Sequence, residues 1–440
     1  MRKQPQVSPP EAITAKQPDS VITQVREYQL ITPLYGGGVA PTEADPITIV
    51  RATEIRGCLR FWWRACRGGK FNENLADMKK EEDAIWGKAY KKGDPAITQE
   101  RTIQITVDPI QRGKYLTPRL LQGIPGYAIF PLQEELKKQE SHVLLENVSF
   151  TLTISFPADR RKDVEAALWA WETFGGIGAR TRRGFGALRC TRVKENERPL
   201  EIDLPQADQQ QTPKWIGEKL ATYVADGLWP VGVPHLKKQG IGLRVVNRGV
   251  TNDGMAVWKD LIDRLKSFRQ RRRPSTRSGG RFGRSIWPEP SAIRQLTRQS
   301  LPTHTIPIPN PRIDKFPRAA FGLPIIFQFK DRDEHNPDNP SKDPRQTVLQ
   351  LATSERLASP IILKPLACRD GAYVGLALIL EGTGIEEEQL ILKTQGQAKE
   401  WPVKAAFDQG ESLVVANENS TSPIRINSQI NALQAFLKYL

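Results

Sequence analysis

The order of regular elements in the first 200 residues constrains the fold of this chain most strongly. The run VSFTLTISF (148–156) alternates apolar and polar residues, which is typical of a strand with one buried face. Similar patterns predict strands at 21–35, 101–110 and 186–193, and helices from about Glu54 and at 160–174. Strand, helix, two strands, helix, strand is the order of a ferredoxin-like unit. We therefore predict an α+β fold with a first domain at about 22–200.

The rest of the chain shows less clear boundaries between domains and linkers. Residues 1–21 are rich in Pro, Gln and charge, so we expect a disordered tail there. The polar, Pro-containing segment 198–213 predicts a linker. A helical pattern at 256–268 and later strand patterns in GLPIIFQFK, SPIILKPLA and YVGLALIL follow it. They favour a second ferredoxin-like domain at 201–440, with a basic insertion near 264–310.

The composition of the chain indicates which kinds of molecule it can bind. The net charge of +15 and the pI of about 9.6 are typical of proteins that bind nucleic acid or another anionic surface. No apolar run reaches the roughly 18 residues that span a membrane. The four cysteines show no CxxC spacing and the four histidines are scattered, so we expect no metal and no cofactor. Without a signal-peptide pattern, a cytoplasmic location is expected.

The helix EIRGCLRFWWRACRG carries a row of arginines. Its apolar residues fall on one broad face, and the tandem Trp62 and Trp63 predict core packing. The remaining narrow face aligns the four arginines Arg56, Arg60, Arg64 and Arg67. Like charges in a row repel each other unless an anion lies along them. That anion is either RNA or acidic residues that fold over the row.

A second basic feature is the stretch WETFGGIGARTRRGFGALRC (171–190), which contains no acid after Glu172. Glycines let a partner approach closely, and their N–H groups can form an anion-binding nest. Arginines add bidentate contacts to phosphate. The stretch predicts a loop that binds a phosphate backbone without base readout. The alternative is a structural turn.

The insertion RLKSFRQRRRPSTRSGGRFGR (264–284) has nine Lys or Arg and no acid. Its Ser, Gly and Pro content predicts disorder in the free protein. It is either a solubilising loop or an arm that becomes ordered on RNA or on an acidic neighbouring subunit.

These motifs together resemble the RAMP superfamily of CRISPR effector proteins. The resemblance is carried by the turn ITPLYGGG, the helix VRATEIRGCLRFWWRA and the loop GGIGARTRRGFG. GYAIFPLQ (126–133), GLPIIFQF (322–329) and ERLASPIILK (355–364) also fit, and they are similar to the two-domain RAMP subunit of type III-B (Cmr) complexes.

The resemblance implies two ferredoxin-like (RRM-like) domains within an RNA-guided complex. It implies contact with the 3′ region of the guide RNA, with the target RNA paired there and with other RAMP subunits, and it does not imply catalysis. From the absence of a long apolar run we expect no membrane partner. Together with the basic stretches, it leads us to expect RNA contacts at the following residues. They are Tyr35, Gly36, Gly37, Gly38, Arg51, Arg56, Arg60, Arg64, Gly175, Gly176, Gly178, Arg180, Arg182, Arg183, Gly184, Gly186, Arg271, Arg272 and Arg273.

Two other functions stay open on the sequence. An endoribonuclease of the RAMP class would need an acid such as Asp45 and a group that moves a proton at a ribose 2′-OH. His142 and His235 are the histidines nearest the first domain, and neither lies in a glycine loop. A scaffold subunit that contacts only protein is the other alternative.

Overall fold

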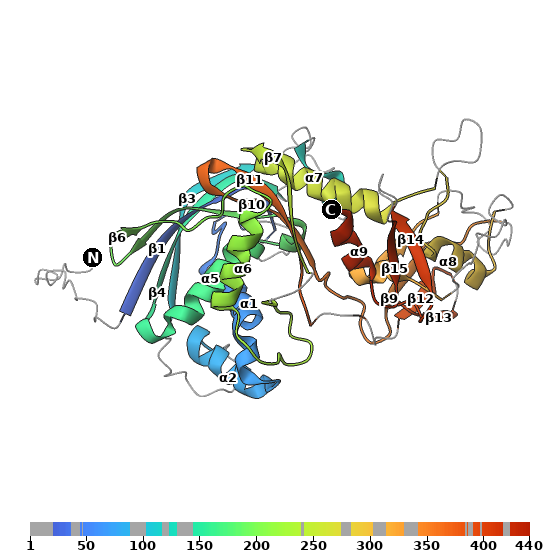
Figure 1. The fold of residues 1–440 in the computed structure, drawn as a ribbon, viewed down its shortest axis with the longest axis horizontal. Coiled ribbons are helices and arrows are strands. Elements are labelled where there is room, and N and C mark those ends of the chain that lie inside the picture. The colour runs from blue at the N-terminus through green and yellow to red at the C-terminus, as the bar shows by residue number, and fades with distance from the viewer. Residues whose placement is uncertain are drawn as a thin grey trace, which may run out of the picture.

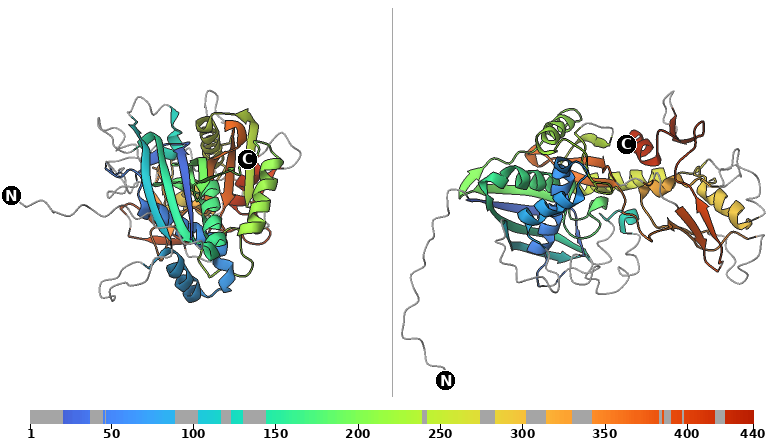
Figure 2. Two further views of the ribbon diagram at one scale, coloured as in Figure 1. Left: turned by 90° about the vertical axis from the view of Figure 1, so that its left-hand side faces the viewer. Right: turned by 90° about the horizontal axis from the view of Figure 1, so that it is seen from below.

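The structure is a computed structural model of the 440-residue chain. It describes residues 21–36, 45, 47–88, 103–116, 123–129, 144–238, 242–273, 283–301, 314–329, 342–382, 385, 390–396, 398–416 and 423–440. The expected tail and the tip of the basic insertion lie outside these ranges. Helices and antiparallel sheets alternate along the chain, which confirms the α+β class. The molecule is elongated, with the first sheet at one end (Figures 1 and 2).

The first half forms the predicted ferredoxin-like unit. Its elements are β1 (Val21–Leu30), α1 (Ala52–Arg67), β3 (Gln104–Tyr115), β4 (Leu144–Pro157), α5 (Arg161–Phe174) and β5 (Leu188–Glu195). The strands are ordered β3-β4-β1-β5 and every neighbouring pair is antiparallel. Short strands β2 (Leu34–Tyr35) and β6 (Arg198–Leu200) extend β4 and β5. The order of sequence patterns therefore predicted the topology of this half.

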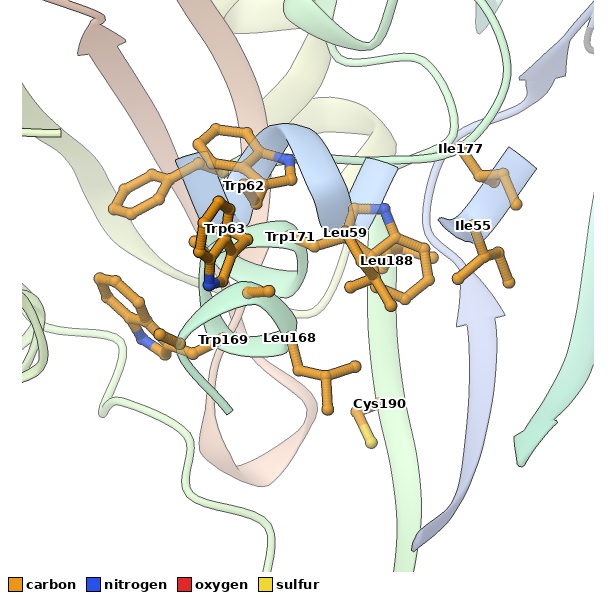
Figure 3. Packing of buried hydrophobic residues seen from close by; sticks show 14 of the residues in the cluster. Ile55, Leu59, Trp62, Trp63, Leu168, Trp169, Trp171, Ile177, Leu188 and Cys190 are labelled. Carbon is orange, nitrogen blue, oxygen red and sulfur yellow. The ribbon is translucent and has the colours of Figure 1, made fainter. Parts of the chain in front are cut away.

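Alternation along the central strands places one set of side chains against α1 and α5. In β4, Phe150, Leu152 and Ile154 are fully buried, while the hydroxyl-bearing residues between them are partly exposed. Figure 3 shows Trp62 and Trp63 of α1 packed near Trp171 of α5, and all three are buried, as predicted. The broad apolar face of α1 is thus explained by the core.

The segment after the first sheet is not a simple linker. Helix α6 (Gln211–Tyr223) packs on α5 and buries Ile216 and Leu220 in the first core. The chain then follows α1, where the N–H of Ala225 donates to Cys66 O at 2.7 Å. The predicted linker, 198–213, ends where α6 begins, and the sequence analysis assigned no structure to the residues up to 238, so it missed this return.

The second half contains the first part of a second ferredoxin-like unit. Strand β7 (Leu243–Thr251), helix α7 (Gly254–Arg269), and strands β10 (Ile361–Ala367) and β11 (Tyr373–Ile379) follow each other in that order. The sheet order β10-β11-β7 matches the first three strands of such a unit. Within the described ranges, no second helix and fourth strand complete this sheet. The domain division at residue 200 therefore stays a proposal.

The far end of the molecule is a separate small core. Its sheet is ordered β13-β12-β9-β8. The strands are β8 (Ile325–Phe327), β9 (Thr347–Leu351), β12 (Leu390–Thr394) and β13 (Glu400–Val403), with α8 (Glu289–Thr297) beside them. A hairpin of β14 (Ser412–Ala416) and β15 (Ile424–Asn427) leads into α9 (Ala432–Tyr439), which packs on α7.

A buried lysine ties the two halves together. Lys364 of β10 is completely buried, and its Nζ donates to the carbonyl oxygens of Glu172 and Gly175, both at 2.8 Å. These carbonyls end α5, where the helix dipole favours a cation. Burial nevertheless lowers the pKa of Lys364 to about 7, and the nearby Glu172 carboxylate only partly opposes this.

This lysine predicts a pH dependence of stability. The pKa of Lys364 is about 10.5 when unfolded and about 7 when folded, so the unfolded chain binds more protons between these values. Stability from this group therefore rises with pH across that window. We expect the free energy of unfolding of the parent, relative to that of Lys364→Met, to increase from pH 7 to pH 9 in urea titrations. Lys259→Met, at an exposed position of α7, is the control for the loss of one lysine, and a difference for Lys364→Met that stays constant from pH 7 to pH 9 would contradict the assignment.

Candidate nucleic-acid interface

The glycine–arginine loop, residues 175–187, joins α5 to β5 where the two halves meet. Its amides point into the protein: the N–H of Gly178 donates to Glu54 Oε1 (2.7 Å). The N–H of Gly186 donates to Pro33 O (2.9 Å). The expectation of an open anion-binding nest at these glycines is therefore wrong, because protein acceptors already occupy their amides.

Close packing explains why the loop contains glycine. At Gly186 the φ angle is +58°, and an added Cβ would lie 1.9 Å from Ile177 O. At Gly184 the φ angle is +83°, and a Cβ would lie 2.6 Å from Trp258 Cδ1 of the second half. Contacts under 3.0 Å also exclude a Cβ at Gly175, Gly176 and Gly178. The glycines fix the shape of the loop and let α7 approach it.

A matched pair of glycine variants tests this. We expect Gly186→Ala to lower the free energy of unfolding by about 2–4 kcal/mol, because it combines a left-handed backbone with a clash against backbone. Gly57, in the middle of α1, has open space around its Cβ position. Gly57→Ala should therefore raise the free energy of unfolding by up to about 1 kcal/mol. Urea unfolding of both variants is the measurement, and equal effects would show that the loop tolerates a side chain.

Two loop arginines hold the second half rather than face solvent. Arg182 Nη1 donates to Ser359 O at 2.5 Å. Arg183 donates from Nη1 to Ile361 O (3.1 Å) and from Nη2 to Phe321 O (3.4 Å). The second half therefore covers part of each of these arginines and leaves them half-buried.

The two arginines belong to a cluster of four positive side chains, Arg180, Arg182, Arg183 and Arg269. Burial lowers the pKa of Arg183 to about 9, and repulsion from Arg269, Arg180 and Arg182 adds to the effect. Burial also lowers the pKa of Arg180, Arg182 and Arg269. In the part of the chain that the structure describes, none of the four forms an ion pair with a carboxylate. Such a cluster favours an anionic ligand.

Arg269 is the member that the sequence did not single out. It is the last residue of α7, and its guanidinium lies 5.2 Å from the centroid of the Phe321 ring. Arg183 donates to the carbonyl of the same Phe321, so the two arginines meet there. In the sequence, Arg269 looks like one more charge in a solvated insertion. The apolar stripe that ends at Phe268 was the only signal of its burial.

The arginine row of α1 has protein partners. Arg60 Nε donates to Glu82 Oε1 at 2.7 Å, and Arg64 pairs with the same carboxylate. Glu82 belongs to α2 (Leu75–Trp86) and is 2% exposed. Arg56 donates to the backbone carbonyl of Trp86 at 2.8 Å. Acidic residues therefore fold over the row, and we leave Arg56, Arg60 and Arg64 out of the proposed interface.

The first-strand turn supports the loop from the other side. Tyr35 is 6% exposed, and its carbonyl accepts a hydrogen bond from the N–H of Ala179 at 2.7 Å. Gly36 is also buried, while Gly37 and Gly38 lie outside the described residues. Arg51 precedes α1. Burial raises the pKa of the neighbouring Glu54 carboxyl, and the positive charge of Arg51 opposes part of this shift.

The residues considered for cleavage have local structural roles. Asp45 Oδ1 accepts hydrogen bonds from the N–H groups of Ile47 (2.9 Å) and Thr48 (2.8 Å), which lower its pKa. The His235 ring stacks on Trp229 with centroids 4.5 Å apart, and burial lowers its pKa. His142 lies outside the described residues. Across the described ranges there is no cluster of metal-ligating side chains and no helix of a length and apolarity that would cross a membrane.

Replacing Arg183 tests whether its charge serves the fold. The charged guanidinium is desolvated and repelled by its neighbours, while its hydrogen bonds to carbonyls favour it. We expect Arg183→Met to leave the free energy of unfolding unchanged or to raise it, because an apolar side chain of similar length avoids the desolvation cost. A loss above about 2 kcal/mol in urea unfolding would mean that the carbonyl contacts dominate.

Comparison with known families identifies the class of domain. Residues 27–189 match the model of the RAMP superfamily. The match covers the first ferredoxin-like unit and the glycine–arginine loop, and it confirms the resemblance drawn from the motifs. Residues 27–189 of this chain are therefore similar to the RAMP superfamily.

Particular relatives are subunits of one CRISPR system. The CRISPR system Cmr subunit Cmr1-1 of Pyrococcus furiosus is 28% identical over 148 residues, 33% of this chain and 41% of the relative. The chain thus matches less than half of that relative's length. Cmr subunit Cmr1-2 of the same organism is 22% identical over 188 residues, 38% of this chain and 95% of the relative.

Solved structures are also similar over much of the chain. The crystal structure of apo Cmr1 from P. furiosus has a TM-score of 0.46 at 16% identity, over 87% of this chain and 94% of that one. The cryo-EM structure of type III-B Cmr-beta bound to cognate target RNA contains a chain with a TM-score of 0.48 at 13% identity. That match covers 83% of this chain and 96% of the other.

Proposed function

We propose that this chain is a non-catalytic RNA-binding subunit of a type III-B CRISPR effector complex. The match to the RAMP superfamily and the Cmr-named relatives support membership of such a complex. RNA binding rests on one observation, the cluster of Arg180, Arg182, Arg183 and Arg269 at the junction of the halves. None of the four forms an ion pair with a carboxylate among the described side chains, and Glu289, which acts on Arg269 at longer range, is paired with Arg318. A phosphate backbone would supply the anion for the cluster.

The RNA we propose is the 3′ region of the guide RNA with the target RNA paired to it, alongside other RAMP subunits. Arginines recognise phosphates in any sequence, and the aromatic residues of the loop region are buried in the protein. Tyr35, Phe185 and Trp258 pack on one another and offer no platform for base stacking. Binding should therefore depend on charge and not on base identity.

A passive role fits the chemistry of the loop. RNA cleavage without a metal needs a base or acid beside a ribose 2′-OH. The loop supplies arginine guanidiniums, which stay protonated at neutral pH and cannot take up that proton. Asp45 uses its carboxylate to hold a local turn through the N–H groups of Ile47 and Thr48.

Arg180 is the loop arginine best placed to reach RNA. It is half-buried and its φ of 58° is left-handed. Its Nε is buried without a hydrogen-bond partner in the described structure, so the exposed part of the side chain would make the contact with RNA. A charge-assisted contact is worth about 1.5–3 kcal/mol, and less where water competes. We expect Arg180→Ala to weaken binding of a labelled single-stranded RNA to the full chain by about 3- to 10-fold. The dependence of log affinity on log salt should become shallower by about 0.7.

The control is Arg112→Ala. Arg112 is exposed on β3, at the opposite edge of the first sheet, and its removal changes the net charge by the same amount. It should change the affinity much less than Arg180→Ala. Equal effects of both variants, or no RNA binding by the parent chain, would refute the proposed interface.

A further inference from the structure

The basic insertion begins as an ordered hairpin stem. After α7, residues 271–273 run antiparallel to residues 283–286. The N–H of Arg273 donates to Arg284 O at 2.8 Å, and the N–H of Gly283 donates back to Arg273 O at 2.9 Å. The N–H of Ile286 donates to Arg271 O at 3.2 Å. The expected disorder is thus wrong for this stem, because backbone hydrogen bonds close it between α7 and α8.

The stem presents charge in a fixed place. Arg272 and Arg273 are both exposed. Arg284, which faces Arg273 across the stem, is half-buried, and burial with repulsion from Arg294 and Arg273 lowers its pKa. In the described part of the insertion the only charged side chains are cationic, so neighbours within the stem repel each other.

The stem also continues the arginine cluster at the junction. Arg269 touches the Phe321 ring, and Arg183 of the loop contacts the carbonyl of that residue. Arg272 and Arg273 follow Arg269 by three and four residues. An extended chain spans about 3.3–3.6 Å per residue, so the exposed arginines lie within roughly 15 Å of the buried cluster. The stem arginines therefore lie close to the arginines at the helix end and the loop.

We infer that Arg272 and Arg273 on the hairpin stem bind the backbone of the same RNA strand that contacts the glycine–arginine loop. The inference rests on the proposed function and extends it to a second surface. Charge complementarity and continuity with the loop cluster both support it. The nine cations of segment 264–284 include one lysine and eight arginines, and arginine suits phosphate through its planar pair of donors.

An acidic protein is the competing partner for such a stem. It would complement the charge equally well, but it would not explain why the stem continues from the cluster at the loop. RNA carries one phosphate per nucleotide, so one strand can contact the arginines of the loop and those of the stem in succession. RNA is also the anionic polymer that the loop is proposed to bind. We therefore favour RNA, and binding of an acidic polypeptide becomes an outcome of the test.

The test compares two double variants of the full chain. Arg272→Ala with Arg273→Ala removes the stem charges, and Arg112→Ala with Arg198→Ala removes two exposed charges from the first sheet. Each protein is titrated with labelled single-stranded RNA of about 4 and about 12 nucleotides, across a series of salt concentrations, and with polyglutamate. Circular dichroism and melting confirm that each variant is folded.

We expect the stem variant to bind the long RNA about 5- to 30-fold more weakly and the short RNA almost normally, because the short strand fills only the loop site. Its salt slope for the long RNA should fall by about 1.4, since each phosphate that is no longer neutralised lowers the slope by about 0.7. The sheet variant should resemble the parent.

Different failures point to different errors. If both double variants weaken binding equally, the effect is one of net charge and the stem site is refuted. If Arg180→Ala weakens binding but the stem variant does not, the loop site stands and the stem inference falls. Loss of polyglutamate binding with normal RNA binding would assign the stem to an acidic protein. A parent chain that binds no RNA would overturn the proposed function and this inference together.

Discussion

The structure depends on the close backbone contact between the glycine–arginine loop and the second half. Gly184 lies so near Trp258 that any side chain would collide with it, and the indole Nε1 donates to Arg183 O at 2.6 Å. Lys364 closes the same junction from β10. Because three residues from separate elements converge there, the second half cannot shift without breaking the loop. These contacts therefore hold the loop in one fixed position between the two halves.

The buried cations at this junction have different surroundings. Lys364 has two carbonyl acceptors at the negative end of α5, and these accept hydrogen bonds from its amine although burial lowers its pKa to about 7. Arg183 also donates to carbonyls, but the charges that act on it are those of Arg269, Arg180 and Arg182. Arg269 lies against the Phe321 ring and is acted on by Arg318 and, in the opposite direction, by Glu289. Packing of the two halves therefore maintains an electrostatic arrangement that is unfavourable without a ligand. Sites with this property commonly serve binding rather than stability.

The sequence predicted those features that depend on local pattern. Alternation and helical periodicity were enough for the ferredoxin-like order of the first half and for the burial of Trp62 and Trp63. They were not enough for Arg60, because its partner Glu82 lies on a helix whose docking no local pattern reveals. The glycines were correctly read as sites of close approach, but the approaching groups are protein: Trp258 at Gly184, and backbone carbonyls such as Ile177 O at Gly186. Contacts between distant segments decided each of these outcomes.

The division between a buried loop and an exposed stem has a consequence for how binding can be tuned. Arg182 and Arg183 hold carbonyls of the second half, so changing them also alters the junction. Arg272 and Arg273 are exposed and contribute little to a core, so their number can change without disturbing the fold. If RNA follows both surfaces, the loop fixes where the strand enters and the stem sets how tightly it is held. Affinity and its salt dependence can then vary independently of the architecture.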